Sequence, residues 1–90
     1  MGKETRLFKS QEPKNRADVS EFLRQLADRV SNGQVVLSQG QQEITLQLPP
    51  NLILEIQAED EEKGTKGVQH SLEVTIKWFD GEQGGPLELR

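Results

Sequence analysis

The sequence has no cysteine and no tyrosine, and its 90 residues include one histidine, one tryptophan and three phenylalanines. Without cysteine the chain has no disulfide framework, no thiol nucleophile and no thiolate metal site, which is compatible with a reducing cytosol. No apolar run approaches the roughly 18 residues of a membrane span, and residues 1–6 lack the apolar core of a signal peptide. We therefore expect a cytoplasmic protein without a membrane partner.

The composition is poor in apolar residues and acidic in balance. Hydrophobic residues make up 32%, the net charge is −4 and the pI is near 5.0. Leu, Ile, Val and Phe together still exceed the roughly 20% below which a chain tends to stay disordered, so a thin core is expected. Because a nucleic-acid backbone is bound by clustered Lys and Arg, we expect no nucleic-acid partner.

The clearest pattern is an amphipathic helix after Pro13. Five apolar residues fall at i, i+3, i+4, i+7 and i+11, namely Val19, Phe22, Leu23, Leu26 and Val30. This spacing predicts a helix with one apolar side. Asn15 is the expected N-cap with Asp18 in the first turn, and Asn32-Gly33 is the expected C-terminal stop. The helix should span 16–31.

The rest of the chain alternates with the period of strands. We expect strands at 34–38, 43–48, 52–59 and 68–78, the first two forming a hairpin, and a short strand at 5–10 in which either Leu7 or Phe8 faces inward. In the last strand one face carries Val68, His70, Leu72, Val74, Ile76 and Trp78. Pro49-Pro50-Asn51 interrupts the ladder, and residues 59–67 are expected to form a charged loop.

One arrangement buries every apolar face with short connections. We predict an α+β fold in which one amphipathic helix packs on one face of a four- to five-stranded, mainly antiparallel sheet, in the order β-α-β-β-β-β. Residues 1–79 should form a single domain and 80–90 a flexible tail. Leu72, Val74 and Ile76 are expected in the core, so truncation of any of them to Ala should unfold much of the population.

The chain also resembles a known family, the amphi-Trp domains. The resemblance is carried by Glu-Phe-Leu-Arg-Gln-Leu-Ala-Asp at 21–28, Gly-Gln-Val-Val-Leu at 33–37, Leu-Glu-Ile at 54–56 and Leu-Glu-Val-Thr-Ile-Lys-Trp at 72–78. It covers about 7–78. Lys77 stands where an acidic residue is common in that family, which makes the outer face of this strand less acidic here. The family is one of unknown function, so the resemblance implies no catalytic or binding residue.

Three residues are weak binding candidates. His70 is the one histidine and lies in the inward register near the strand's open end, where a packed or half-exposed ring competes with a general base or metal ligand. Trp78 closes the same face, either as a lid on the core or as a ring at the mouth of a ligand or partner groove. Phe79, in the opposite register, would be an exposed aromatic.

The charged clusters do not form a recognisable chemical motif. Residues 59–62, Glu-Asp-Glu-Glu, could hold a hard cation but lack the spaced ligands and internal glycine of a calcium loop, so we favour a solvated hairpin tip. The basic residues Arg6, Lys9, Lys14 and Arg16 could meet an acidic partner, or simply be solvated. No phosphate loop, nucleophile elbow or zinc-protease motif occurs. We assign no catalytic, cofactor-binding or metal-binding residue and no cofactor.

Three functions remain open. The leading hypothesis is a non-catalytic protein-interaction module that joins a protein partner, or its own copy, through a sheet edge. The alternative is a small-ligand-binding domain with a groove near Trp78. An enzyme built on His70 with carboxylate partners is a distant third.

Overall fold

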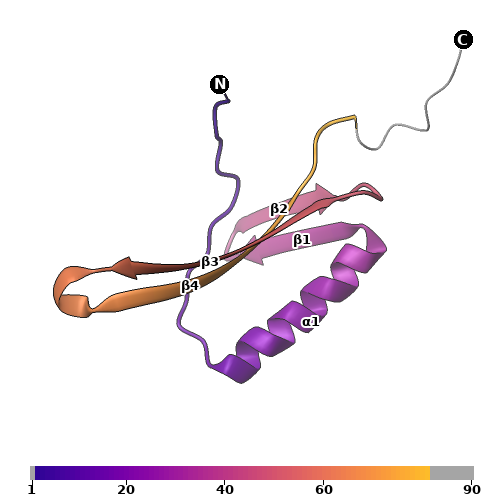
Figure 1. Ribbon diagram of the computed structural model, residues 1–90. Helices are drawn as coiled ribbons and strands as arrows, with labels where there is room; N and C mark the ends of the chain where they lie inside the picture. The colour runs from indigo at the N-terminus through magenta and orange to yellow at the C-terminus, as the bar shows by residue number, and fades with distance from the viewer. Residues whose placement is uncertain (1, 82–90) are drawn as a thin grey trace, which may run out of the picture. The chain divides into compact units, whose positions relative to one another are not determined.

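The computed structural model describes residues 2–81 (Figure 1). Contacts divide the chain into two compact units, residues 1–48 and 49–90. The first unit contains α1 (Arg16–Asn32), β1 (Gln34–Gln39) and β2 (Gln42–Gln47); the second contains β3 (Ile53–Glu62), the short 3-10 helix η1 (Gly64–Lys66) and β4 (Val68–Lys77). This is an α+β chain with antiparallel strand pairs, as the alternating patterns predict.

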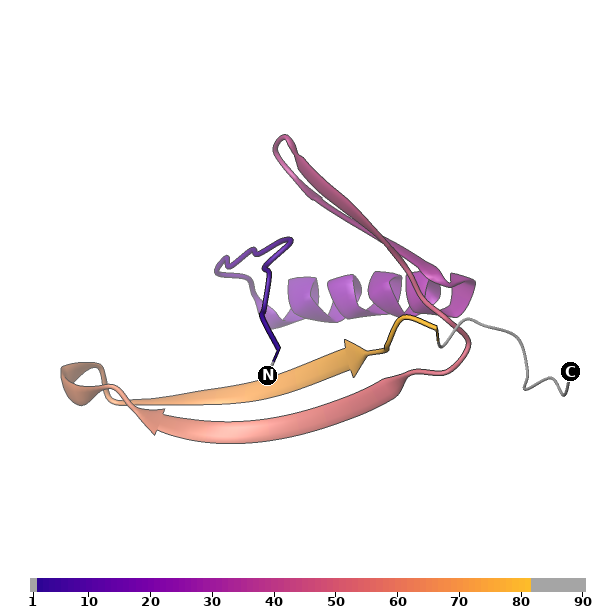
Figure 2. The same ribbon diagram turned by 90° about the horizontal axis from the view of Figure 1, so that it is seen from above.

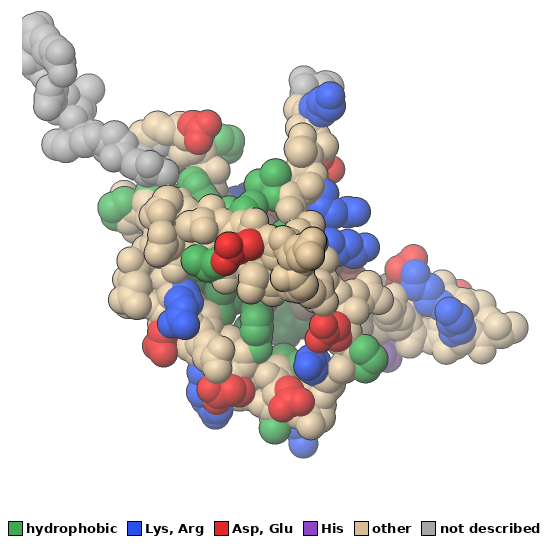
Figure 3. Space-filling view, turned by 180° about the vertical axis from the view of Figure 1, so that it is seen from behind, with side chains coloured by type: hydrophobic (Ala, Val, Ile, Leu, Met, Phe, Trp, Pro, Cys, Tyr) green, Lys and Arg blue, Asp and Glu red, His purple; other side chains and the backbone are tan. Residues whose placement is uncertain are grey.

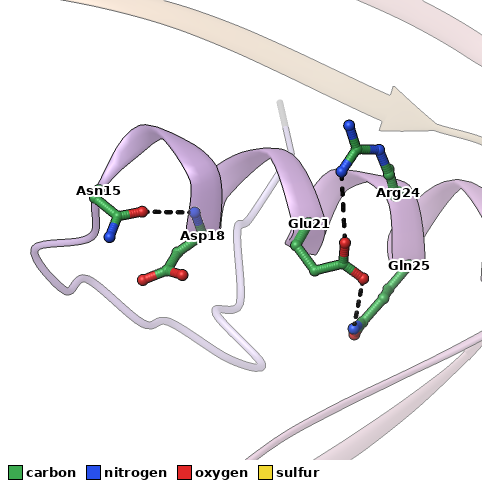
Figure 4. Close-up of polar contacts among 5 residues, drawn as sticks. All are labelled: Asn15, Asp18, Glu21, Arg24 and Gln25. Carbon is green, nitrogen blue, oxygen red and sulfur yellow. Dashed lines mark hydrogen bonds and ion pairs between the residues drawn. The ribbon is translucent and has the colours of Figure 1, made fainter.

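The caps of α1 are those that the sequence predicts. Asn15 is the N-cap: its side-chain Oδ1 accepts a hydrogen bond of 2.7 Å from the backbone N–H of Asp18 (Figure 4). Gly33 ends the helix in the left-handed conformation, with φ 84° and ψ 8°, and its N–H donates to the carbonyls of Arg29 and Val30. Both ends satisfy backbone groups that a helix terminus otherwise leaves unpaired.

The first hairpin packs against the helix through its apolar side. β1 and β2 are antiparallel, and the register sets Val35 opposite Leu46 and Leu37 opposite Ile44. Val35 is 6% exposed and is a buried core residue of this unit. It lines a small cavity of about 130 Å³ together with Phe22 and Leu26 of α1. The core of this unit therefore lies between α1 and β1.

The second hairpin is longer, and the short helix η1 forms its turn. β3 and β4 pair over ten residues each, from Ile53 opposite Lys77 to Glu62 opposite Val68. Figure 2 shows the two strands running side by side as a long, curved ribbon that ends in the η1 turn. The turn is closed by Gly64 and Gly67, both with positive φ, and by a 2.7 Å hydrogen bond from Lys63 N–H to the Gly67 carbonyl.

The prediction of one four- to five-stranded sheet is wrong. The described residues form two separate two-stranded sheets, β1–β2 and β3–β4. The segment between β2 and β3 contains Pro49 and Pro50, which have no N–H to donate to a ladder, so the pairing of the first hairpin does not continue into the second. The break that the sequence shows at these prolines separates sheets rather than strands of one sheet.

Two further boundary predictions are also wrong. Residues 5–10 form no strand, because Leu7 and Phe8 are adjacent rather than alternating and no described strand pairs with this segment. Of these two residues, Phe8 is half-buried and Leu7 is exposed. The acidic run 59–62 belongs to β3 and not to a loop, because its backbone pairs with residues 68–71 of β4. The prediction of a flexible tail concerns mainly residues 82–90, which lie outside the described residues, and the single domain over 1–79 stays a prediction.

Candidate interaction surface

The register of the second hairpin sorts its side chains onto two chemically different faces. Directly paired residues of an antiparallel ladder point to the same side. Pairing of Leu54 with Ile76, Ile56 with Val74 and Ala58 with Leu72 therefore creates an apolar face consisting of Leu54, Ile56, Ala58, Leu72, Val74 and Ile76. The opposite side, the acidic face, carries Glu55, Gln57, Glu59, Glu61, Glu73, Thr75 and Lys77.

The apolar face is open to solvent. Leu72 is 72% exposed, Leu54 65%, Ile56 59% and Val74 55%, while Ile76 is half-buried. The sequence therefore predicts correctly which side chains of β4 share a face, but it does not predict their burial. Leu72 and Val74 are exposed and are not core residues. A two-stranded hairpin has no second layer of its own to cover this face. A cluster of large apolar side chains left exposed in this way is typical of an interaction site.

The acidic face holds carboxylates close enough to interact. The pKa of the Glu73 carboxyl is raised above its ordinary value, first by a side-chain hydrogen bond with Glu59 and by the negative charge of Glu59, and then by slight desolvation and the charge of Glu55. Gln57 donates a hydrogen bond of 2.6 Å to the carboxylate of Glu59. At neutral pH the middle of this face is therefore crowded with negative charge.

Two cross-strand contacts between polar side chains lie along the hairpin, one on each face. On the acidic face Lys77 Nζ lies 2.9 Å from the Glu55 carboxylate. On the other side, beyond the apolar residues, His70 Nδ1 lies 2.6 Å from Oδ1 of Asp60, its direct partner in the ladder. Both pairs are well exposed, so each contributes little to stability by itself. Their effect is to fix the arrangement of charge along the hairpin.

Each strand of the chain also has an edge without a neighbouring strand in the described part, because each sheet contains two strands. The edges differ in their chemistry. β3 carries five acidic residues and no Lys or Arg, whereas β4 carries one Glu and one Lys. Strand edges dense in like charge resist pairing with another strand. Among the two ten-residue edges, that of β4 is therefore the more receptive.

The three weak binding candidates lie in or directly after β4. The His70 side chain is at the surface, where its purple atoms are visible in Figure 3, and its ring contacts Asp60. Trp78 directly follows the strand and is half-buried, and Phe79 is 67% exposed. The structure thus groups Trp78 and Phe79 at the end of the hairpin opposite to His70. It does not assemble the three into one site.

Several features bear on the other site predictions. Among residues 2–81, no group of three or more His, Asp or Glu side chains is arranged to hold a metal ion. The acidic run 59–62 splits between the two faces, because its residues alternate along β3. A surface groove of about 410 Å³ lies in the first unit, between the segment before α1 and the helix, and Val19 and Phe22 form its apolar side. No described helix is long and apolar enough to cross a membrane.

Sequence reasoning missed the acidic face as a surface. Alternation alone places Glu73, Thr75 and Lys77 together, but the proximity of Glu73 to Glu59 depends on the cross-strand register. That register is set by the length of the turn at 63–67, whereas the sequence predicts a longer loop over 59–67. The polar pairs His70–Asp60 and Lys77–Glu55 are the signal that could have identified the register.

The described residues thus form one α-helix, a short 3-10 helix and two antiparallel hairpins, an α+β arrangement. The family model of the Amphi-Trp domain matches residues 1–90, so the chain belongs to the Amphi-Trp domain family, and the resemblance seen in its helix and last strand is confirmed. Searches of curated proteins and of solved structures find no match.

Proposed function

We propose that this chain is a non-catalytic protein-interaction module that binds an extended segment of a partner by strand addition at the free edge of β4. The observation that carries the proposal is a ten-residue edge with one Glu and one Lys, next to an exposed apolar face. In strand addition, backbone hydrogen bonds supply affinity and alternate side chains supply specificity. A segment added beside β4 would extend the apolar face by one strand.

The charge of the hairpin supports β4 over β3 as the docking edge. A strand beside β3 would meet Glu55, Glu59 and Glu61 on one side and Asp60 and Glu62 on the other. A strand beside β4 would meet Leu72, Val74 and Ile76 on one side and mainly uncharged residues on the other. The proposal places this module in the cytoplasm, apart from nucleic acid, and the net charge of −4 supports that exclusion.

Hydrogen exchange on a captured complex tests the proposal. The chain is used to capture partners from the native cell extract, and amide exchange is compared between the free chain and the complex. In a two-stranded hairpin, alternate N–H groups of β4 point outward and exchange rapidly. We expect residues 68–77 to gain protection in the complex while residues 34–47 of the first hairpin do not. Protection confined to the first unit, or no reproducible partner, would contradict the proposal.

We propose as an alternative function that the chain binds a small ligand in a groove near Trp78. Trp78 is half-buried and would report on a ligand bound beside it. Titration of small molecules from the cell extract should quench or shift the tryptophan fluorescence if a groove near Trp78 is a binding site. The signal is specific to this position, because the chain has one tryptophan and no tyrosine.

A further inference from the structure

We propose that the segment added at β4 is β4 of a second copy, paired antiparallel in the register that sets Thr75 opposite Thr75. This inference rests on the proposed function and names its partner. The product is a sheet of four strands in two copies, in the order β3–β4–β4–β3. The observation that leads to it is the distribution of charge and apolar residues around Thr75.

The pairing follows from the symmetry of an antiparallel ladder. In a two-fold arrangement centred on one residue, positions equally far before and after the centre lie opposite each other. Centring on Thr75 therefore sets Glu73 of each copy opposite Lys77 of the other. On the other side of the sheet it sets Val74 opposite Ile76, and Leu72 opposite Trp78. Every direct pair is charge-complementary, apolar or, at the centre, Thr with Thr.

Other registers lack this complementarity. Centring on Glu73 sets two glutamates opposite each other, and centring on Lys77 sets two lysines opposite each other. Centring on Leu72 or Val74 leaves Glu73 opposite a neutral residue, Ser71 or Thr75. Among the two-fold registers centred on residues 72–77, the one at Thr75 is unique in pairing Glu73 with Lys77, so the charges select a single alignment.

The surroundings of Glu73 strengthen the case for a lysine from outside the hairpin. Glu73 lies near the carboxylates of Glu59 and Glu55, and the pKa of its carboxyl is raised first by a side-chain hydrogen bond with Glu59 and then by the negative charges of both. The hairpin's own Lys77 contacts Glu55 at 2.9 Å. Its ammonium group has three donors, so it can keep Glu55 and also reach Glu73 of the second copy. Pairing thus brings two cations to the most crowded part of two acidic faces.

The size of the contact sets its strength. The paired segment covers residues 72–78 in each copy, which is far fewer than the roughly 20–30 residues a side of a standard stable interface. We therefore expect a concentration-dependent dimer with a dissociation constant in about the micromolar to millimolar range. Exposed ion pairs are screened by salt, so the dimer should weaken as ionic strength rises.

Charge reversal tests the register directly. Glu73→Lys sets lysine opposite lysine at both positions, and Lys77→Glu sets glutamate opposite glutamate. Each single variant should dissociate roughly ten- to a hundredfold more readily than the wild type, measured by sedimentation equilibrium on the full chain. An equimolar mixture of the two variants restores both opposite-charge pairs in a heterodimer, as does the double variant in a homodimer. Both should associate at about the wild-type strength.

Glu59→Lys is the matched control. It makes the same change of charge on the same face, beside Glu73, but on β3, away from the paired edge. It should therefore leave the dimer intact. Circular dichroism of each variant checks that the hairpin is still folded, so that a loss of association is not a loss of structure. Slower exchange of the β4 amides at high concentration, seen in the wild type and absent in each single variant, is the second readout.

The outcomes separate this inference from the proposed function. A wild type that stays monomeric at millimolar concentration, or single variants whose mixture fails to associate, overturns the dimer. If such a monomer still gains protection over 68–77 in a complex with another protein, strand addition stands and its partner is heterologous. A dimer insensitive to charge at 73 and 77, with protection outside β4, overturns the register.

Discussion

The joint between α1 and β1 depends on a single backbone conformation, that of Gly33. Its φ of 84° lies in the left-handed region, where residues with a Cβ are strained. Its N–H caps the helix, and its carbonyl accepts a 2.9 Å hydrogen bond from the N–H of Leu48 at the end of the first hairpin. A Cβ added here would have Leu48 O, at 3.7 Å, as its nearest neighbour, an ordinary contact. The cost of a side chain at this position is therefore conformational and not steric.

Because the cost is conformational, the loss of stability in Gly33→Ala can be given a magnitude. An alanine held in the left-handed helical conformation costs roughly 1–2 kcal/mol. For a chain of this size each kcal/mol lowers the melting temperature by about 4–8 °C, so a fall of roughly 5–15 °C is expected. The helical signal in circular dichroism at 222 nm is the appropriate measure, because α1 provides most of it. Gly33→Asn should lose less than Gly33→Ala, since asparagine tolerates this conformation better.

The control is Gly2→Ala, where an added Cβ would meet no atom within 4 Å, and which should melt with the wild type. An alanine variant as stable as the wild type would refute the strained cap. An asparagine variant less stable than the alanine variant would show that crowding against Leu48, rather than backbone conformation, sets the cost.

The remaining predictions concern the other end of the helix, the core and the acidic face. Asn15→Ala removes the hydrogen bond to Asp18 N–H and should destabilise the helix by about 1 kcal/mol, measured by thermal melting, with Asn15→Asp close to the wild type. Val35→Ala removes two buried methyl groups and should lower the free energy of unfolding by about 1–2 kcal/mol. Leu72→Ala, at a position 72% exposed, should lower it by less than about 1 kcal/mol in the same assay. Equal losses of stability in the two variants would contradict the difference in burial. The raised pKa of Glu73 means that its protonated form favours the folded hairpin, an advantage that is present below the ordinary pKa of a glutamic acid and is lost as pH rises through the raised value. Glu73→Gln should therefore have a higher melting temperature than the wild type at pH 7, measured in dilute solution where pairing of copies is minor. The difference should vanish near pH 3, where Glu73 is protonated in both the folded and the unfolded state. A difference in melting temperature that persists at low pH would point to a cause other than charge.

The elements of the first unit follow closely from local sequence. Asn15 and Gly33 act on backbone groups within a few residues of themselves, so the ends of α1 are readable without any tertiary information. The same holds for the turn at Gly40, which joins β1 to β2. Family membership was also readable, because the patterns at 21–28 and 72–78 retain their order and spacing.

The predictions that are wrong concern features that depend on residues far apart in the chain. The acidic run 59–62 contains no strand signal of its own, yet it extends β3 because residues 68–71 pair with it. Residues 5–10 have strand-like composition but no partner strand in the described part of the chain, so they form none. The β-propensity of a segment favours a strand, but the strand forms only where a neighbouring strand is available for hydrogen bonding.

By itself the sequence determined the helix with both of its caps, the two faces of β4 and the order of the strands, because each depends on periodicity or on a single residue's backbone preference. The tertiary structure decided which strands share a sheet, how far β3 extends, and whether an apolar face is covered. The alternation of Leu72, Val74 and Ile76 predicts that these side chains lie on one side of the strand. Their burial requires a second layer of structure over that side, which no pattern within β4 can predict. The proximity of Glu73 to Glu59 comes from the cross-strand register and could be found only once β3 and β4 were aligned.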